Sequence, residues 1–214
     1  SGNMVYEEVF SDGALITGGY NASGYPLNVL RSFPSRINRR RYAEPFIFNL
    51  EIDGQSLAFG LELVDFKADK KDESCESVAT LKSTVMAITI KVHTLLDGSQ
   101  MFSRWLEIEN HSEKAVKVSR LSVFSGALES LDDDALDDAK SVNDVYSLGY
   151  FCNDAWGNEG QFKWHALTPD TKVIEGRFGR DRFRHPLLFI KNNLTGKMWF
   201  SQIGYSGGFR YTVD

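Results

Sequence analysis

Apolar side chains recur at every second position in several stretches of this chain, and this period constrains the fold more than any other feature. The clearest case runs over residues 46–52, where alternate positions are apolar: Phe46, Phe48, Leu50 and Ile52. Ile47, Asn49 and Glu51 occupy the positions between them, on the other face. Successive side chains of a β-strand point to opposite faces, so the pattern predicts a half-buried strand.

The same alternation predicts further strands, separated by turn signals. After the turn Asp53-Gly54, residues 57–64 are expected to return as a hairpin arm. Residues 84–93 form the next arm, which ends at Asp97-Gly98, and residues 102–110 and 115–124 are expected to pair as another hairpin. The charged stretch 67–77 is interpreted as a loop.

Composition agrees with a strand-rich fold. The chain has 214 residues, of which 13% are aromatic and 18 are glycine. Long strands joined by short hairpins, without alternating helices, favour stacked antiparallel sheets. We therefore predict one all-β domain over residues 1–214, a large antiparallel β-sandwich. The aspartate-rich stretch 128–148 is expected to form a connector with at most one short helix.

Charge and motifs exclude several function classes. A net charge of -5 gives no general attraction to nucleic acid, and no run of about 18 apolar residues suits a bilayer. The four histidines lack metal-ligand spacing, so neither a metal nor another cofactor is expected. Cys75 and Cys152 are compatible with one disulfide, although such a distant pair more often means two unpaired thiols. They do not fix the cellular compartment, which stays unknown.

Several short motifs, in order, resemble glycoside hydrolase family 36, the α-galactosidases. They are Ser103-Arg104, Asn110, Ser125, Ala155-Trp156-Gly157-Asn158-Glu159, the stretch 179–186, and Tyr205-Ser206-Gly207. The resemblance is to the N-terminal β-supersandwich domain of that family and covers roughly residues 25–214. In the family this domain precedes a (β/α)₈ barrel that holds the catalytic aspartates.

The resemblance implies that this chain is a non-catalytic accessory fragment of a longer retaining glycoside hydrolase. Its expected partners are a carbohydrate and the catalytic barrel of the same chain, and the resemblance leaves room for a homo-oligomer. No catalytic residue is expected here. Retaining enzymes place two carboxyl groups about 5 Å apart, and nothing in this sequence nominates such a pair.

Five residues are candidates for sugar binding by this resemblance: Trp156, Glu159, Asn158, Arg41 and Tyr42. An indole offers a flat apolar face to a pyranose ring. Asn158 stands where the family has arginine, and Arg41 stands where it has an aspartate that binds galactose hydroxyls. A guanidinium only donates hydrogen bonds, so Arg41 argues against plain α-galactoside specificity.

Three alternatives remain open. A free-standing carbohydrate-binding module would need Trp156 or Trp164 exposed. A mutarotase-like epimerase would need a histidine and a carboxylate facing a common sugar oxygen. Two arginine runs, within residues 36–41 and 177–184, are either solvated faces or, beside Trp156, a site for acidic sugars.

Overall fold

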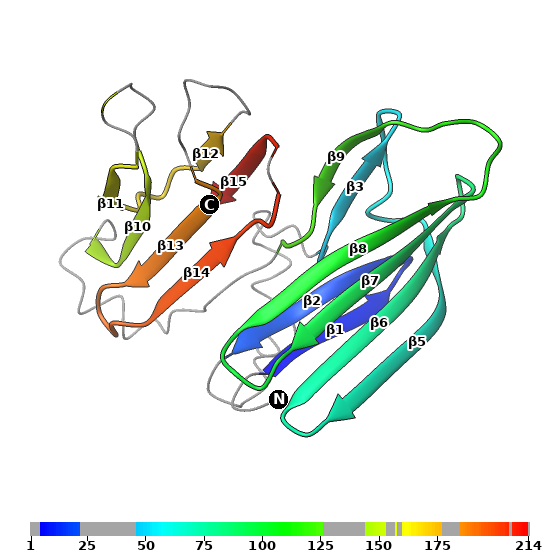
Figure 1. Cartoon of the computed structure of the whole chain (residues 1–214), viewed down its shortest axis with the longest axis horizontal. Coiled ribbons are helices and arrows are strands. Elements are labelled where there is room, and N and C mark those ends of the chain that lie inside the picture. The colour runs from blue at the N-terminus through cyan, green and yellow to red at the C-terminus, as the bar shows by residue number, and fades with distance from the viewer. Residues whose placement is uncertain are drawn as a thin grey trace. The chain divides into compact units, whose positions relative to one another are not determined.

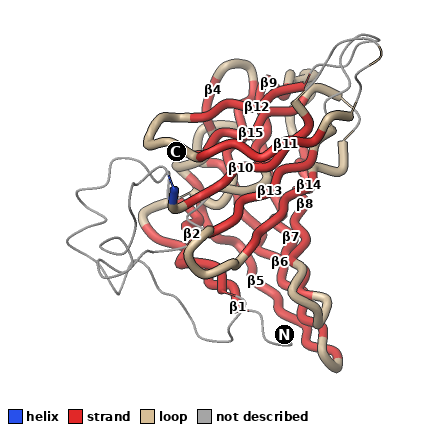
Figure 2. The backbone as a smooth tube through the Cα atoms, turned by 90° about the vertical axis from the view of Figure 1, so that its left-hand side faces the viewer, coloured by secondary structure: helices blue, strands red, loops and turns tan. Residues whose placement is uncertain are grey.

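The structure is a computed structural model that describes residues 5–21, 46–125, 144–152, 157, 160–176, 185–205 and 207–213. The described residues form strands and connections, apart from one short helical turn at Asp144 (blue in Figure 2) that is too short to count as a helix, which confirms the all-β prediction. No helix in these ranges has the length and apolar character needed to cross a membrane. Two compact units divide the chain, Ser1–Ser130 (unit 1) and Leu131–Asp214 (unit 2), and each is described by itself.

Unit 1 holds three antiparallel sheets, with strand orders β1-β2, β4-β3-β9 and β5-β6-β7-β8 (Figure 1). The strands are β1 (Val5–Ser11), β2 (Ala14–Asn21), β3 (Asn49–Ile52), β4 (Gln55–Ser56), β5 (Leu61–Lys71), β6 (Ser74–Ser83), β7 (Ile88–Leu96), β8 (Phe102–Asn110) and β9 (Val118–Ser122).

The core of unit 1 lies where the predicted alternation places it. Ile88, Ile90 and Val92 of β7 are fully buried and pack with Leu50 and Ile52 of β3. The turn predicted at Asp53-Gly54 is confirmed, because both residues have positive φ, 51° and 82°, as a tight two-residue hairpin requires. One detail differs: Ile47 is buried as completely as Phe48, and the strand begins only at Asn49.

Two predicted pairings in unit 1 are wrong. The strand at residues 118–122 does not pair with β8; it pairs antiparallel with β3, 60 or more residues earlier in the chain. The arm expected over residues 57–64 is displaced: β4 (Gln55–Ser56) is the strand that returns beside β3, and Leu61 already begins β5, which pairs with β6. Alternation within a segment predicts that it is a strand, whereas the choice of neighbour depends on tertiary packing.

The charged stretch 67–77 is a hairpin instead of a loop. β5 and β6 pair from Leu61↔Ser83 to Lys71↔Ser74, with Asp72 at φ 52° in the turn. Ten of the eleven β5 residues are exposed. Because this edge strand contributes few side chains to the core, its sequence carries no apolar alternation, and backbone pairing with β6 defines it.

A buried ion pair anchors the β1-β2 hairpin to the four-stranded sheet. The Arg104 guanidinium is 2% exposed and pairs with the Glu8 carboxylate. Thr94 donates a hydrogen bond to Glu8 (3.1 Å), and Arg104 donates one to Thr94 (2.9 Å). The guanidinium also lies 4.9 Å from the ring centre of Tyr6. These contacts neutralise a charge that would be costly to bury alone.

Unit 2 holds two antiparallel sheets, with strand orders β11-β10-β13-β14 and β12-β15 (Figure 1). The strands are β10 (Tyr146–Phe151), β11 (Phe162–Ala166), β12 (Lys172–Gly176), β13 (Leu187–Asn192), β14 (Met198–Gln202) and β15 (Phe209–Val213). The end of the predicted connector 128–148 is therefore strand, and its residues 128–143 lie outside the described ranges.

One face of the four-stranded sheet in unit 2 packs a small core. Leu148 of β10, Leu188 of β13 and Ile174 of β12 are its buried residues. The side chains at the alternate positions of these strands lie on the other face. The aromatic rings there include Phe162, Trp164 and Phe200, which are exposed. This difference between the two faces matters for the candidate site.

Candidate functional site

All five predicted sugar-binding residues lie outside the described ranges. Trp156, Asn158 and Glu159 belong to the connection between β10 and β11, and Arg41 and Tyr42 to the connection between β2 and β3. Both arginine runs fall outside as well. The roles of these residues therefore remain predictions.

The base of the β10-β11 connection is well defined. Phe151 pairs with Phe162, and the Cys152 amide donates a 2.8 Å hydrogen bond to the Gln161 carbonyl. Within the connection, Gly157 and Gly160 have φ values of 84° and 73°, which other residues adopt at a cost. The hairpin thus holds both ends of the segment that contains Trp156 and Glu159 close together, at the ends of strands β10 and β11.

A thiol and an imidazole meet beside this base. The Cys152 Sγ lies 3.1 Å from Nε2 of His165 and 3.5 Å from the carbonyl oxygen of Tyr150. The His165 ring stacks on Tyr150, with ring centres 5.0 Å apart and planes 26° apart. Cys152 and Cys75 are both free, half-buried cysteines.

The exposed face of the β11-β10-β13-β14 sheet is aromatic. Trp164, Phe189 and Phe200 lie in one row across it, with Gly149 between the first two. Phe162 contacts Trp164 and Phe189 edge to face, at centre distances of 5.4 and 5.5 Å. Trp164 is 45% and Phe200 53% exposed. We call these four rings the aromatic face.

Gly149 makes this arrangement of rings feasible. A Cβ atom at this position would lie 2.6 Å from Phe162 and 2.9 Å from Trp164, closer than real Cβ contacts allow. The absence of a side chain on β10 therefore leaves room for both rings to lie across the strand. Because the rings meet edge to face, they do not form one flat platform.

In unit 1, the outer face of the β5-β6-β7-β8 sheet, opposite the core, carries a chain of charged groups. Lys91 Nζ lies 2.5 Å from Glu109 and 3.4 Å from Glu107. The hydrogen bond from Lys91 holds the pKa of Glu109 below its usual value, and the same bond raises the pKa of Lys91. Glu107 and Glu109 share a strand face as the sequence indicates, and Lys91 joins them.

His93 continues this chain toward an exposed indole. Its Nε2 lies 3.2 Å from Glu107 and its Nδ1 3.5 Å from Glu76, while the ring stacks on Trp105 at 4.8 Å. The His93 side chain is only 12% exposed, and neither nitrogen has an aligned hydrogen-bond partner among the described residues. Sequence reasoning missed this group, although alternate polar positions on β7 and β8 signalled it.

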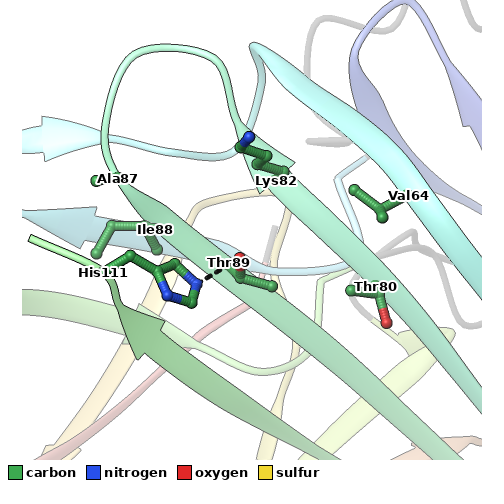
Figure 3. Close-up of a pocket in the computed structure, with 7 residues that line it drawn as sticks. All are labelled: Val64, Thr80, Lys82, Ala87, Ile88, Thr89 and His111. Carbon is green, nitrogen blue, oxygen red and sulfur yellow. Dashed lines mark hydrogen bonds between the residues drawn. The ribbon is translucent and has the colours of Figure 1, made fainter.

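The same outer face has an open depression of about 440 Å³ (Figure 3). It is lined by Val64, Thr80, Lys82, Ala87, Ile88, Thr89 and His111. Figure 3 shows the His111 ring directed at Thr89, where its Nε2 lies 2.9 Å from the hydroxyl. The lining offers hydroxyl and cationic donors to a polar ligand.

The positions of these side chains bear on two kinds of chemistry, metal binding and acid–base catalysis on a sugar. In the described ranges no three histidine, cysteine, aspartate or glutamate side chains gather as metal ligands. His93 does face a carboxylate, as an epimerase would need. However, its two nitrogens point at two different carboxylates and its ring lies under Trp105, so neither nitrogen faces open solvent where a sugar oxygen would lie.

No family model and no curated protein matches the sequence, whereas solved structures match its fold. The galactosidase domain of the α-galactosidase-sucrose kinase AgaSK matches with a TM-score of 0.63 at 13% identity, covering 99% of this chain and 34% of that one. An α-galactosidase from Lactobacillus brevis gives 0.62 at 12% identity, with coverage of 99% and 35%.

A third match extends the pattern. A doubly substituted variant of the family 36 α-galactosidase AgaA from Geobacillus stearothermophilus, solved with raffinose, gives a TM-score of 0.58 at 11% identity, covering 99% of this chain and 38% of that one. The chain thus has the fold of part of these enzymes, and it spans between 34% and 38% of their length. The resemblance noted in the sequence is confirmed at the level of fold.

Proposed function

We propose that this chain is the N-terminal accessory domain of a retaining glycoside hydrolase of the α-galactosidase type. The observation that carries the proposal is the fold: 99% of the chain matches about a third of solved α-galactosidases. In this proposal the catalytic carboxylates lie in a barrel domain of the same longer protein, and the present chain shapes the sugar pocket.

The aromatic face supports a role beside another domain. Contiguous exposed rings are uncommon on a surface that stays in water, and they typically mark an interaction site. Trp164 and Phe200 are exposed, and no described residues of unit 2 form a layer over them. We infer that the remainder of the enzyme covers this face, and that the isolated chain self-associates through it.

The base of the β10-β11 hairpin supports a role at the pocket mouth. The connection that it carries holds Trp156, Asn158 and Glu159, and a tight base presents such a segment at a sheet edge. We propose that Trp156 stacks on the sugar and that Glu159 accepts a hydroxyl hydrogen bond. Arg41 and Tyr42 complete the set, with Arg41 favouring a sugar that bears an acidic group.

The direct test compares the longer protein with the present chain on nitrophenyl α- and β-glycosides, uronic sugars included. Turnover by the longer protein alone supports the accessory role and identifies the sugar. Turnover by this chain alone would overturn it. In the longer protein, Trp156→Ala should lower kcat/KM about tenfold or more through the lost stacking, while Trp105→Ala, on the outer face of unit 1, serves as the matched control.

A second candidate is a free-standing carbohydrate-binding module, which the 45% exposure of Trp164 favours. The edge-to-face packing of Phe162 on Trp164, at 87°, weighs against it, because a flat platform would need rings lying side by side. Isothermal titration of the isolated chain with neutral and uronic oligosaccharides separates the two. Binding abolished by Trp164→Ala would favour the module.

A further inference from the structure

The Cys152 and His165 pair of unit 2 has no part in the function proposed above. The thiol sulfur and the imidazole Nε2 are 3.1 Å apart, within reach for proton transfer. From this geometry we infer that Cys152 is a nucleophilic thiol activated by His165, and that it is a modification site for hydroperoxides.

The imidazole is held in place by a third side chain. His165 stacks on the ring of Tyr150, which itself packs against the core of unit 2. A nucleophile, a base in contact with it, and a group that orients the base together form the arrangement found around activated cysteines. Tyr150 is a positioning residue in this scheme, and its carbonyl oxygen also lies near the thiol.

The pair is placed where a small reagent can reach it. β11, which carries His165, is an edge strand of its sheet, and the His165 side chain is exposed. Cys152 is half-buried. Cys75 in β6 offers an internal comparison, since it is equally half-buried, yet its thiol has no hydrogen-bond partner within the described part of the chain.

The chemistry balances without any further reagent. The Cys152 thiol proton passes to His165 Nε2, and the thiolate attacks one oxygen of hydrogen peroxide. The S–O bond forms as the O–O bond breaks, and the leaving hydroxide takes the proton from the imidazolium and becomes water. Sulfur is oxidised to a sulfenic acid, and the peroxide is reduced.

If the proposed function holds, oxidation of Cys152 has an effect on sugar binding, because of where Cys152 lies. Cys152 is the last residue of the hairpin base before the connection that contains Trp156 and Glu159. Oxidation there would then alter sugar binding in the longer enzyme. The reactivity of Cys152 does not depend on the accessory-domain function. An experiment can therefore contradict either proposal without contradicting the other.

The test measures both cysteines of the intact chain in one tube. Rates of carbamidomethylation by iodoacetamide, and of sulfenic-acid trapping by dimedone after hydrogen peroxide, are read for each cysteine by peptide mass spectrometry. We expect Cys152 to react at least about tenfold faster than Cys75 at pH 7. His165→Asn should remove that advantage and leave Cys75 unchanged, whereas His111→Asn, which changes an exposed histidine of unit 1, should have no effect.

The His165→Asn variant separates activation from simple exposure, because losing the imidazole removes the base and leaves Cys152 at least as accessible. A Cys152 rate no greater than that of Cys75, or an unchanged Cys152 rate in His165→Asn, would each overturn the inference.

Discussion

At the scale of single residues, Gly149 determines whether the aromatic face can form. We predict that Gly149→Ala destabilises the protein by about 1 kcal/mol, because displacing Phe162 and Trp164 loses ring contacts of roughly 0.5–1.5 kcal/mol each. Alanine also lowers the conformational entropy of the unfolded chain, which offsets at most about 1 kcal/mol of this destabilisation. Denaturant unfolding gives the change, and Gly204→Ala, with nothing within 4 Å, is the neutral control. Equal effects in both variants would contradict the account.

Ionisation of Tyr6 is predicted to lower the stability of the fold at alkaline pH. Burial raises the pKa of Tyr6 to about 12, outweighing the nearby Arg104 charge. The fold therefore favours the neutral phenol, so this contribution is complete below pH 10 and is lost as the pH rises from 10 to 12. The loss reaches about 2 kcal/mol at pH 12.

The matching measurement compares unfolding of the wild type and Tyr6→Phe between pH 9 and pH 12. The variant should lose less stability over that range than the wild type does. Burial also raises the pKa of Tyr211, so absorbance of phenolate in the folded wild type should show late-titrating tyrosine that Tyr6→Phe reduces by one group. Parallel stability curves for the two proteins would show that Tyr6 is not protected from ionisation.

At the scale of elements, the aromatic face is a property of four paired strands. We predict that Trp164→Ser with Phe200→Ser reduces self-association of the isolated chain without a large loss of stability, since both side chains are already about half exposed. Sedimentation velocity measures the association. Phe59→Ser with Phe66→Ser, which removes two equally exposed rings of unit 1, is the matched control. If both double substitutions reduce self-association equally, the association arises from exposed hydrophobic side chains in general and not from the aromatic face.

At the scale of the whole molecule, we predict that residues 1–214 behave as one domain despite the two compact units. Among the described residues of unit 2, the buried core cluster consists of Leu148, Ile174 and Leu188. So small a core is not expected to support independent folding. Calorimetry of the whole chain should show one transition, and a fragment of residues 131–214 should lack dispersed amide resonances. Two separate transitions would contradict the prediction.

The sequence by itself determined the fold class and much of the strand content. Alternation at Ile88, Ile90 and Val92, and the turn at Asp53-Gly54, depend on neighbours close in the chain, and both were predicted correctly. The stretch 67–77 was predicted wrongly, because an exposed edge strand needs no apolar period.

Only the tertiary structure decided which strands pair and which side chains meet. β9 lies beside β3, His93 lies between two carboxylates, and His165 contacts both the Cys152 sulfur and the Tyr150 ring. Each of these contacts joins residues distant in sequence. Local pattern specifies how one segment buries its own face, whereas pairing depends on the packing of all segments together.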